Sequence, residues 1–96
     1  MGHCPYEQLK DLETVLDEIR ALKGVQEVKP GIFYIKRKPF LHFHEKAGAR
    51  WADAKCGASW GPQINIPFKA SKKEQANFLD LVKKCYQKTC QALDVN

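Results

Sequence analysis

The sequence predicts a single α+β domain over residues 1–96, in which an N-terminal and a C-terminal helix pack on one face of a small, mainly antiparallel sheet. Three features of the chain predict this fold. An amphipathic helical repeat opens the chain, β-branched and aromatic residues fill its middle, and a capped helical repeat closes it. The expected order of main elements is therefore helix, four strands, helix. A chain of 96 residues has room for one modest core.

The first predicted element is a helix over residues 5–23. Pro5 suits a first helical turn, and Gly24 suits the left-handed conformation that often ends a helix. One apolar stripe runs along it at three- and four-residue spacing: Leu9, Leu12, Val15, Leu16, Ile19 and Leu22. After the helix we expect a short extended segment at 25–28, in the position of an edge strand, and a turn at 29–31.

The central stretch, residues 32–45, is predicted to form a β-hairpin. Two extended runs, 32–36 and 40–45, flank the basic break at 37–39. Because successive strand residues face opposite ways, Phe33, Ile35, Leu41 and Phe43 are expected to face the core. The same alternation places on the opposite face Tyr34, Lys36, Phe40, His42 and His44.

A third main strand is expected at 49–55 and a fourth at 63–68. In the third, the small alanines suit a helix-covered face, so Arg50, Ala52 and Ala54 should point to the helices. Trp51 and Asp53 then join His42 and His44, although a one-residue slip in register would reverse this assignment. The loop at 56–62 carries Trp60, which we expect to pack as a lid over the end of the core.

The last predicted helix begins at a capping box and runs to about Leu93. Ser71 and Glu74 have the spacing at which each side chain can bond the backbone N–H of the other residue.

The charge of the chain is +5, and it is concentrated in the middle. Residues 29–73 carry ten basic groups against two acidic ones, whereas residues 1–28 carry three against six. This asymmetry suits either a polyanionic partner or a solvated basic surface. No apolar run spans a bilayer, no signal-peptide pattern is present, and the four cysteines match no zinc ribbon, so we expect a cytoplasmic protein with reduced thiols.

The face without helices is the candidate functional surface. We expect its binding residues to be Tyr34, His42, His44, Trp51 and Asp53, with a protein partner, a second copy of the chain or a small ligand as the occupant. The leading interpretation is therefore a non-enzymatic interaction domain that does not enter a membrane.

Other functions remain open on the same residues. His42-x-His44 with Asp53 has the ligand types of a metal site, and Cys56 with His44 resembles a nucleophile and its base. No particular cofactor is indicated. A basic single-stranded nucleic-acid binder would instead use aromatic rings beside cations: Tyr34, Phe40 and Trp51 with Lys36, Arg37, Lys38, Arg50 and Lys55.

Four short stretches carry a resemblance to known sequences. They are Ile-Arg-Ala-Leu-Lys-Gly-Val at 19–25, Pro-Gly-Ile-Phe at 30–33, Leu-His-Phe-His-Glu at 41–45 and Ala-Asp at 52–53. Over most of residues 12–86 the chain resembles short uncharacterised bacterial proteins. More distantly, the layout is similar to the YdhG-like domains of unknown function, which are compact α+β units. The resemblance implies the fold and a bacterial source, and no activity.

Overall fold

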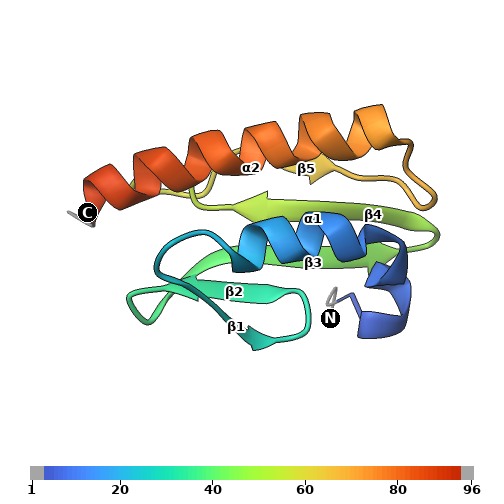
Figure 1. Ribbon diagram of the computed structural model, residues 1–96, viewed down its shortest axis with the longest axis horizontal. Coiled ribbons are helices and arrows are strands. Elements are labelled where there is room, and N and C mark those ends of the chain that lie inside the picture. The colour runs from blue at the N-terminus through green and yellow to red at the C-terminus, as the bar shows by residue number, and fades with distance from the viewer. Residues whose placement is uncertain (1–3, 94–96) are drawn as a thin grey trace.

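The computed structural model describes residues 4–93. Residues 1–3 and 94–96 lie outside the described range, and the prediction of a cytoplasmic location drew partly on residues 1–3. Eight elements follow one another along the chain (Figure 1): η1 (Tyr6–Leu12), α1 (Glu13–Arg20), β1 (Val25–Lys29), β2 (Ile32–Ile35), β3 (Lys38–Lys46), β4 (Ala49–Ala54), β5 (Ile64–Asn65) and α2 (Lys72–Ala92).

The five strands form one antiparallel sheet in the order β1-β2-β3-β4-β5. The predicted α+β class and antiparallel pairing are confirmed. The sheet has five strands where four main ones were expected, because the segment after the first helix pairs with β2, with a register shift between Glu27 and Lys29. The predicted strand 63–68 contracts to Ile64–Asn65, since Pro67 has no N–H to donate to a ladder.

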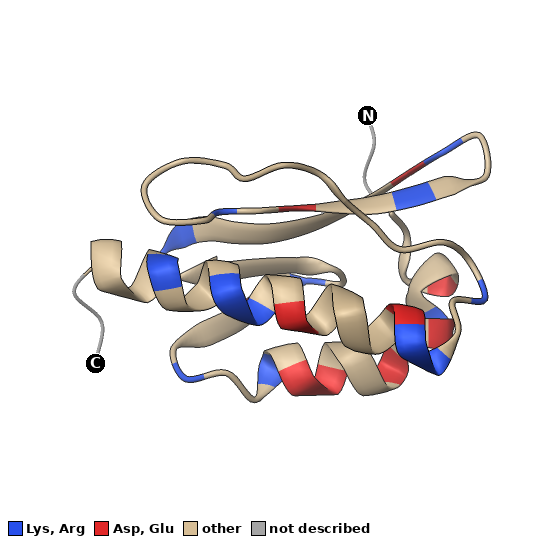
Figure 2. Ribbon diagram, turned by 90° about the horizontal axis from the view of Figure 1, so that it is seen from above, with Lys and Arg blue, Asp and Glu red and all other residues tan. Residues whose placement is uncertain are grey.

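Both helices lie on the same side of the sheet, with α1 beside α2 (Figures 1 and 2). The N-terminal helix is not continuous, as the periodicity had predicted, but begins as the 3₁₀ segment η1. The carbonyl of Gln8 accepts a hydrogen bond of 2.6 Å from Arg50 Nη1, where an α-helix would offer it to the N–H four residues on. The irregular backbone of Leu12 (φ −107°, ψ 20°) then joins η1 to α1.

The core lies between the helices and the sheet. The four side chains predicted to face it, Phe33, Ile35, Leu41 and Phe43, are all buried, which confirms the alternation in the central hairpin. The ring of Phe43 packs against that of Phe78 from α2, with centroids 5.6 Å apart. Ser71 and Glu74 form the predicted capping box at the start of α2. Within residues 4–93 no helix combines the length and apolarity that crossing a bilayer requires.

Phe40 departs from the predicted alternation. Phe33 pairs with Leu41 but Tyr34 pairs with Pro39, so Phe40 is an extra residue of β3 at a β-bulge. The bulge turns two consecutive residues, Phe40 and Leu41, into the core, and both are fully buried. The prediction that Phe40 lies on the outer face is therefore wrong.

Arg50 faces the helices as predicted, and there it is buried rather than part of a solvated basic surface. Its guanidinium donates to both carboxylate oxygens of Asp11, at 2.7 and 2.9 Å. The remaining donors reach the carbonyl oxygens of Gln8, Ile66 and Pro67. The hydrogen bonds from Arg50 to the carboxylate hold the pKa of Asp11 below its ordinary value. Arg50 is thus a structural cation, and the nucleic-acid interpretation loses one of its charges.

Candidate functional site: the outer face of the sheet

The side of the sheet opposite the helices, the outer sheet face, brings together four of the five predicted binding residues. In the β3–β4 ladder His42 is paired with Asp53, and His44 with Trp51. The expectation that Trp51 and Asp53 share a face with the two histidines is therefore confirmed. All four side chains are half-buried, since each stands on a sheet surface among large neighbours.

The two histidines are linked to their neighbours by polar and ring contacts. His44 Nε2 lies 3.1 Å from a carboxylate oxygen of Asp53. The His44 ring also stacks on Trp51, with centroids 5.6 Å apart and planes 26° apart. His42 meets His44 edge-on at 5.9 Å. These contacts position the rings of His44 and Trp51 against each other, so neither ring stands alone on the surface.

Trp60 extends this cluster, and its expected position as a lid over the core is wrong. The chain after β4 turns back on itself, and Lys55 pairs with Trp60 in an isolated antiparallel bridge. The indole then lies 5.2 Å from the His42 ring and remains 44% exposed. Lys55 Nζ lies over its ring at 5.4 Å. We call His42, His44, Trp51 and Trp60 the His–Trp row.

Tyr34 is the predicted binding residue that the structure does not bring into this row. It lies in β2 opposite Pro39 and Gln26, whereas the β2 neighbour of His42 is Ile32. Tyr34 therefore borders the row from the next strand. The place of Trp60 could not be predicted from the sequence, because the bridge at Lys55 depends on the path of a loop that no periodicity describes.

The structure gives little geometric support to a metal site. His44 Nε2, which could bind a metal, already faces the carboxylate of Asp53. Over the described range 4–93, no group of three or more histidine, cysteine, aspartate or glutamate side chains is placed to hold a metal ion.

Cys56 and His44, the predicted nucleophile and base, are not brought together. Trp51 lies opposite His44, and Cys56 is five residues further along the same chain, or about 16 Å at ~3.3 Å per residue. Cys56 packs against the core, close to the Cys85 thiol. Burial, and then the neighbouring Cys56, raise the pKa of the Cys85 thiol to about 12. The Cys85 thiol is therefore a poor nucleophile near neutral pH.

No protein-family model, curated protein or solved structure matches this chain. Its function is therefore argued from the geometry of its own residues.

Proposed function

We propose that the protein is a non-enzymatic interaction domain that binds another protein chain on the outer sheet face, through the His–Trp row. The observation that supports this most is the exposed indole of Trp60, which lies between His42 of the outer sheet face and Lys55. Tryptophan buries a large apolar area on binding and loses little side-chain entropy, which makes it a frequent anchor of protein interfaces. A location in the bacterial cytoplasm belongs to the same proposal and rests on the sequence argument.

A protein partner is favoured over single-stranded nucleic acid because the structure removes part of the nucleic-acid surface. Phe40 lies in the core and Arg50 is paired with Asp11. Trp51 stacks on His44, which leaves Trp60 as the exposed ring of the row. Binding a single strand by stacking requires several free aromatic platforms for successive bases. One anchor with a polar rim instead resembles the centre of a protein interface.

Site-specific photocrosslinking in cells tests this proposal. A photoreactive phenylalanine analogue is placed at Trp60, and in a matched control at Leu81, which is 47% exposed on α2 in the opposite layer. We expect a discrete protein adduct at position 60 and none of the same mass at 81. Mass spectrometry then identifies the partner and shows whether it is a second copy of this chain.

Two results would contradict the proposal. Equal adducts from both positions would show non-specific contact, and an adduct removed by ribonuclease or deoxyribonuclease would show a nucleic-acid partner. The enzyme alternative is tested separately by the zinc content of untagged protein, since stoichiometric metal that is lost in a His42→Ala, His44→Ala double variant would favour it.

A further inference from the structure

The middle of the outer sheet face carries little charge. Six of its residues are related by cross-strand pairing or by alternation along β2, β3 and β4, and we call them the central patch: Ile32, Tyr34, His42, His44, Trp51 and Asp53. The patch contains one carboxylate and neither lysine nor arginine. The opposite layer differs, since charged residues recur along both helices (Figure 2). The central patch is instead rich in rings, which suits a partner surface that is itself aromatic and low in charge.

The centre of this face lies close to His42. β3 is the middle strand of the five, and His42 is the middle residue of Lys38–Lys46. The exposed indole of Trp60 lies beside the His42 ring, with centroids 5.2 Å apart. Trp60 is therefore near the middle of the face, where the residues that contribute most to binding usually cluster. A twofold axis through that point brings Trp60 of one chain against the same region of a second chain.

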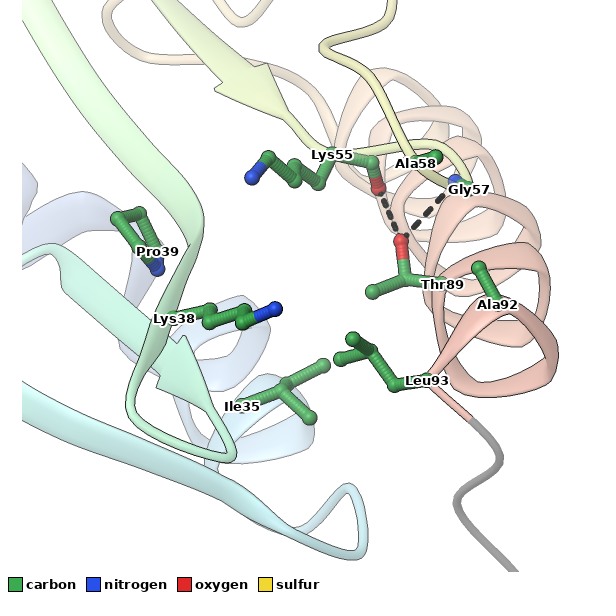
Figure 3. Close-up of a pocket in the computed structure, with 9 residues that line it drawn as sticks. All are labelled: Ile35, Lys38, Pro39, Lys55, Gly57, Ala58, Thr89, Ala92 and Leu93. Carbon is green, nitrogen blue, oxygen red and sulfur yellow. Dashed lines mark hydrogen bonds between the residues drawn. The ribbon is translucent and has the colours of Figure 1, made fainter.

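The loop that carries Trp60 is fixed on both sides of the indole. At its start, the hydroxyl of the buried Thr89 from α2 donates to the Lys55 carbonyl at 2.7 Å (Figure 3). At its end, the Gly61 N–H donates to the Ala54 carbonyl of β4 at 2.9 Å. An anchor that is already in position loses less conformational entropy on binding than one on a free loop. Trp60 is therefore suited to a rigid contact with a flat surface.

The charged groups beside Trp60 have both signs. Lys55 Nζ lies over the indole at 5.4 Å. Asp53 is two residues earlier on the same side of the chain, and its carboxylate lies 3.1 Å from His44 Nε2. A patch with both signs can meet its own copy across a twofold axis, because each charge can face the opposite one, whereas a patch of one sign repels its copy. A polyanion would instead require cations along the face.

The outer sheet face is large enough for a stable dimer. The chain measures 36 Å by 29 Å in the plane of Figure 1, in which the strands lie side by side. A contact over most of that plane buries about 800 Å² on each chain, which is the size of a standard stable protein interface. Two sheets stacked face to face lie about 10 Å apart, and large rings such as the indole of Trp60 fill a gap of this width.

From these features we infer that the partner is a second copy of this chain, and that the two outer sheet faces pack against each other around a twofold axis close to Trp60. The dimer has four layers, with the two sheets in the middle and a pair of helices on each outer side. The inference rests on the function proposed above, since it names the protein that occupies the same face. The alternative is a partner of different sequence, and the experiments below separate the two.

Sedimentation equilibrium of the untagged full chain, over a range of concentrations, tests the dimer. We expect the mass of two chains for the wild type. Trp60→Glu places a carboxylate at the centre of the contact and should weaken self-association by about thirtyfold or more, the loss typical of a central anchor. The matched control Leu81→Glu changes a similarly exposed apolar side chain on α2 and should leave the dimer unchanged. Retained amide spectra show that both variants are folded.

Crosslinking of the purified protein locates the contact. A photoreactive phenylalanine analogue replaces Tyr34, which leaves Trp60 in place, and the chain is mixed with an equal amount of isotope-labelled wild type. We expect crosslinked peptides that join an unlabelled chain to β2, β3 or β4 of a labelled one. The same analogue at Leu81 should give no such peptides.

Three results would overturn the inference: a monomer at every concentration, a dimer that Trp60→Glu leaves intact, or crosslinks from Tyr34 to the helices of the labelled chain. The proposed function is judged separately, by the adduct that forms at Trp60 in cells. An adduct with a different protein would uphold that function and overturn the second-copy inference. A monomer together with no specific adduct at Trp60 would overturn both.

Discussion

The cations at the two ends of β4 have opposite surroundings. Arg50 lies near the start of β4, and Lys38 and Lys55 lie near its other end. The side chain of Arg50 is fully buried, and its donors are bonded to Asp11 and to three carbonyl oxygens. Lys38 is exposed at the start of β3, Lys55 Nζ lies over the Trp60 ring, and within residues 4–93 neither lysine is in a salt bridge. Both regions belong to the same basic middle of the sequence.

The difference shows that charge alone does not indicate a binding surface. A buried cation whose donors are all bonded holds elements together, and here Arg50 joins η1, β4 and the segment after β5. A surface lysine outside any salt bridge retains bonding capacity for a partner. Net charge therefore overestimates the surface available to a partner, and the distinction can be tested by changing each cation in turn.

The largest effect is expected from Arg50→Met. The change leaves Asp11 and three carbonyl groups without their donor, and breaking a buried ion pair costs ~3–5 kcal/mol. Urea denaturation followed by circular dichroism measures this loss as a lower midpoint. The matched control, Lys46→Met, should change the free energy of unfolding by less than about 0.5 kcal/mol. Equal effects in the two variants would show that Arg50 is not the structural cation described here.

An intermediate loss of folding stability is expected when the pH is lowered. Because Arg50 lowers the pKa of Asp11 below its ordinary value of 3.8, the unfolded chain takes up a proton at higher pH than the folded one. The stabilisation is complete above about 3.8 and is lost as the pH falls through the folded value. Denaturation at a series of acidic pH values should show wild type converging on Asp11→Asn, which lacks this titration. Parallel curves would contradict the prediction.

The smallest effect on stability is expected from replacing Lys38 or Lys55. Lys38→Met and Lys55→Met should each change the free energy of unfolding by less than about 0.5 kcal/mol, since within residues 4–93 neither lysine is in a salt bridge. Thermal denaturation of the variants beside Arg50→Met measures this directly. A loss comparable to that of Arg50→Met would show that the lysines are structural and would remove the contrast between the two ends.

Strand alternation predicted a large part of the candidate site. It placed His42 and His44 on one face and expected Trp51 and Asp53 to share that face, and the structure pairs these residues across β3 and β4. This succeeded because the period of two is a local property of the backbone, and the alanines at 52 and 54 indicated which face the helices cover.

The features of the site that the sequence did not predict have a different origin. Phe40 is turned inward by a bulge, Arg50 is paired with a residue 39 positions away, and Trp60 is placed by the fold of a loop. None of these depends on a repeating pattern. Each is decided by contacts between segments that are distant or irregular in sequence.

The sequence by itself determined the class of fold, the four core residues of the central hairpin, the helix cap at Ser71 and the side of the sheet on which the histidines lie. Those features follow from local periodicity and from hydrogen bonds between near neighbours. Only the tertiary structure decided which cation is buried and bonded, which cations lie at the surface, and which tryptophan remains exposed. Desolvation and pairing depend on every group that surrounds a side chain, and those groups meet only when the chain has folded.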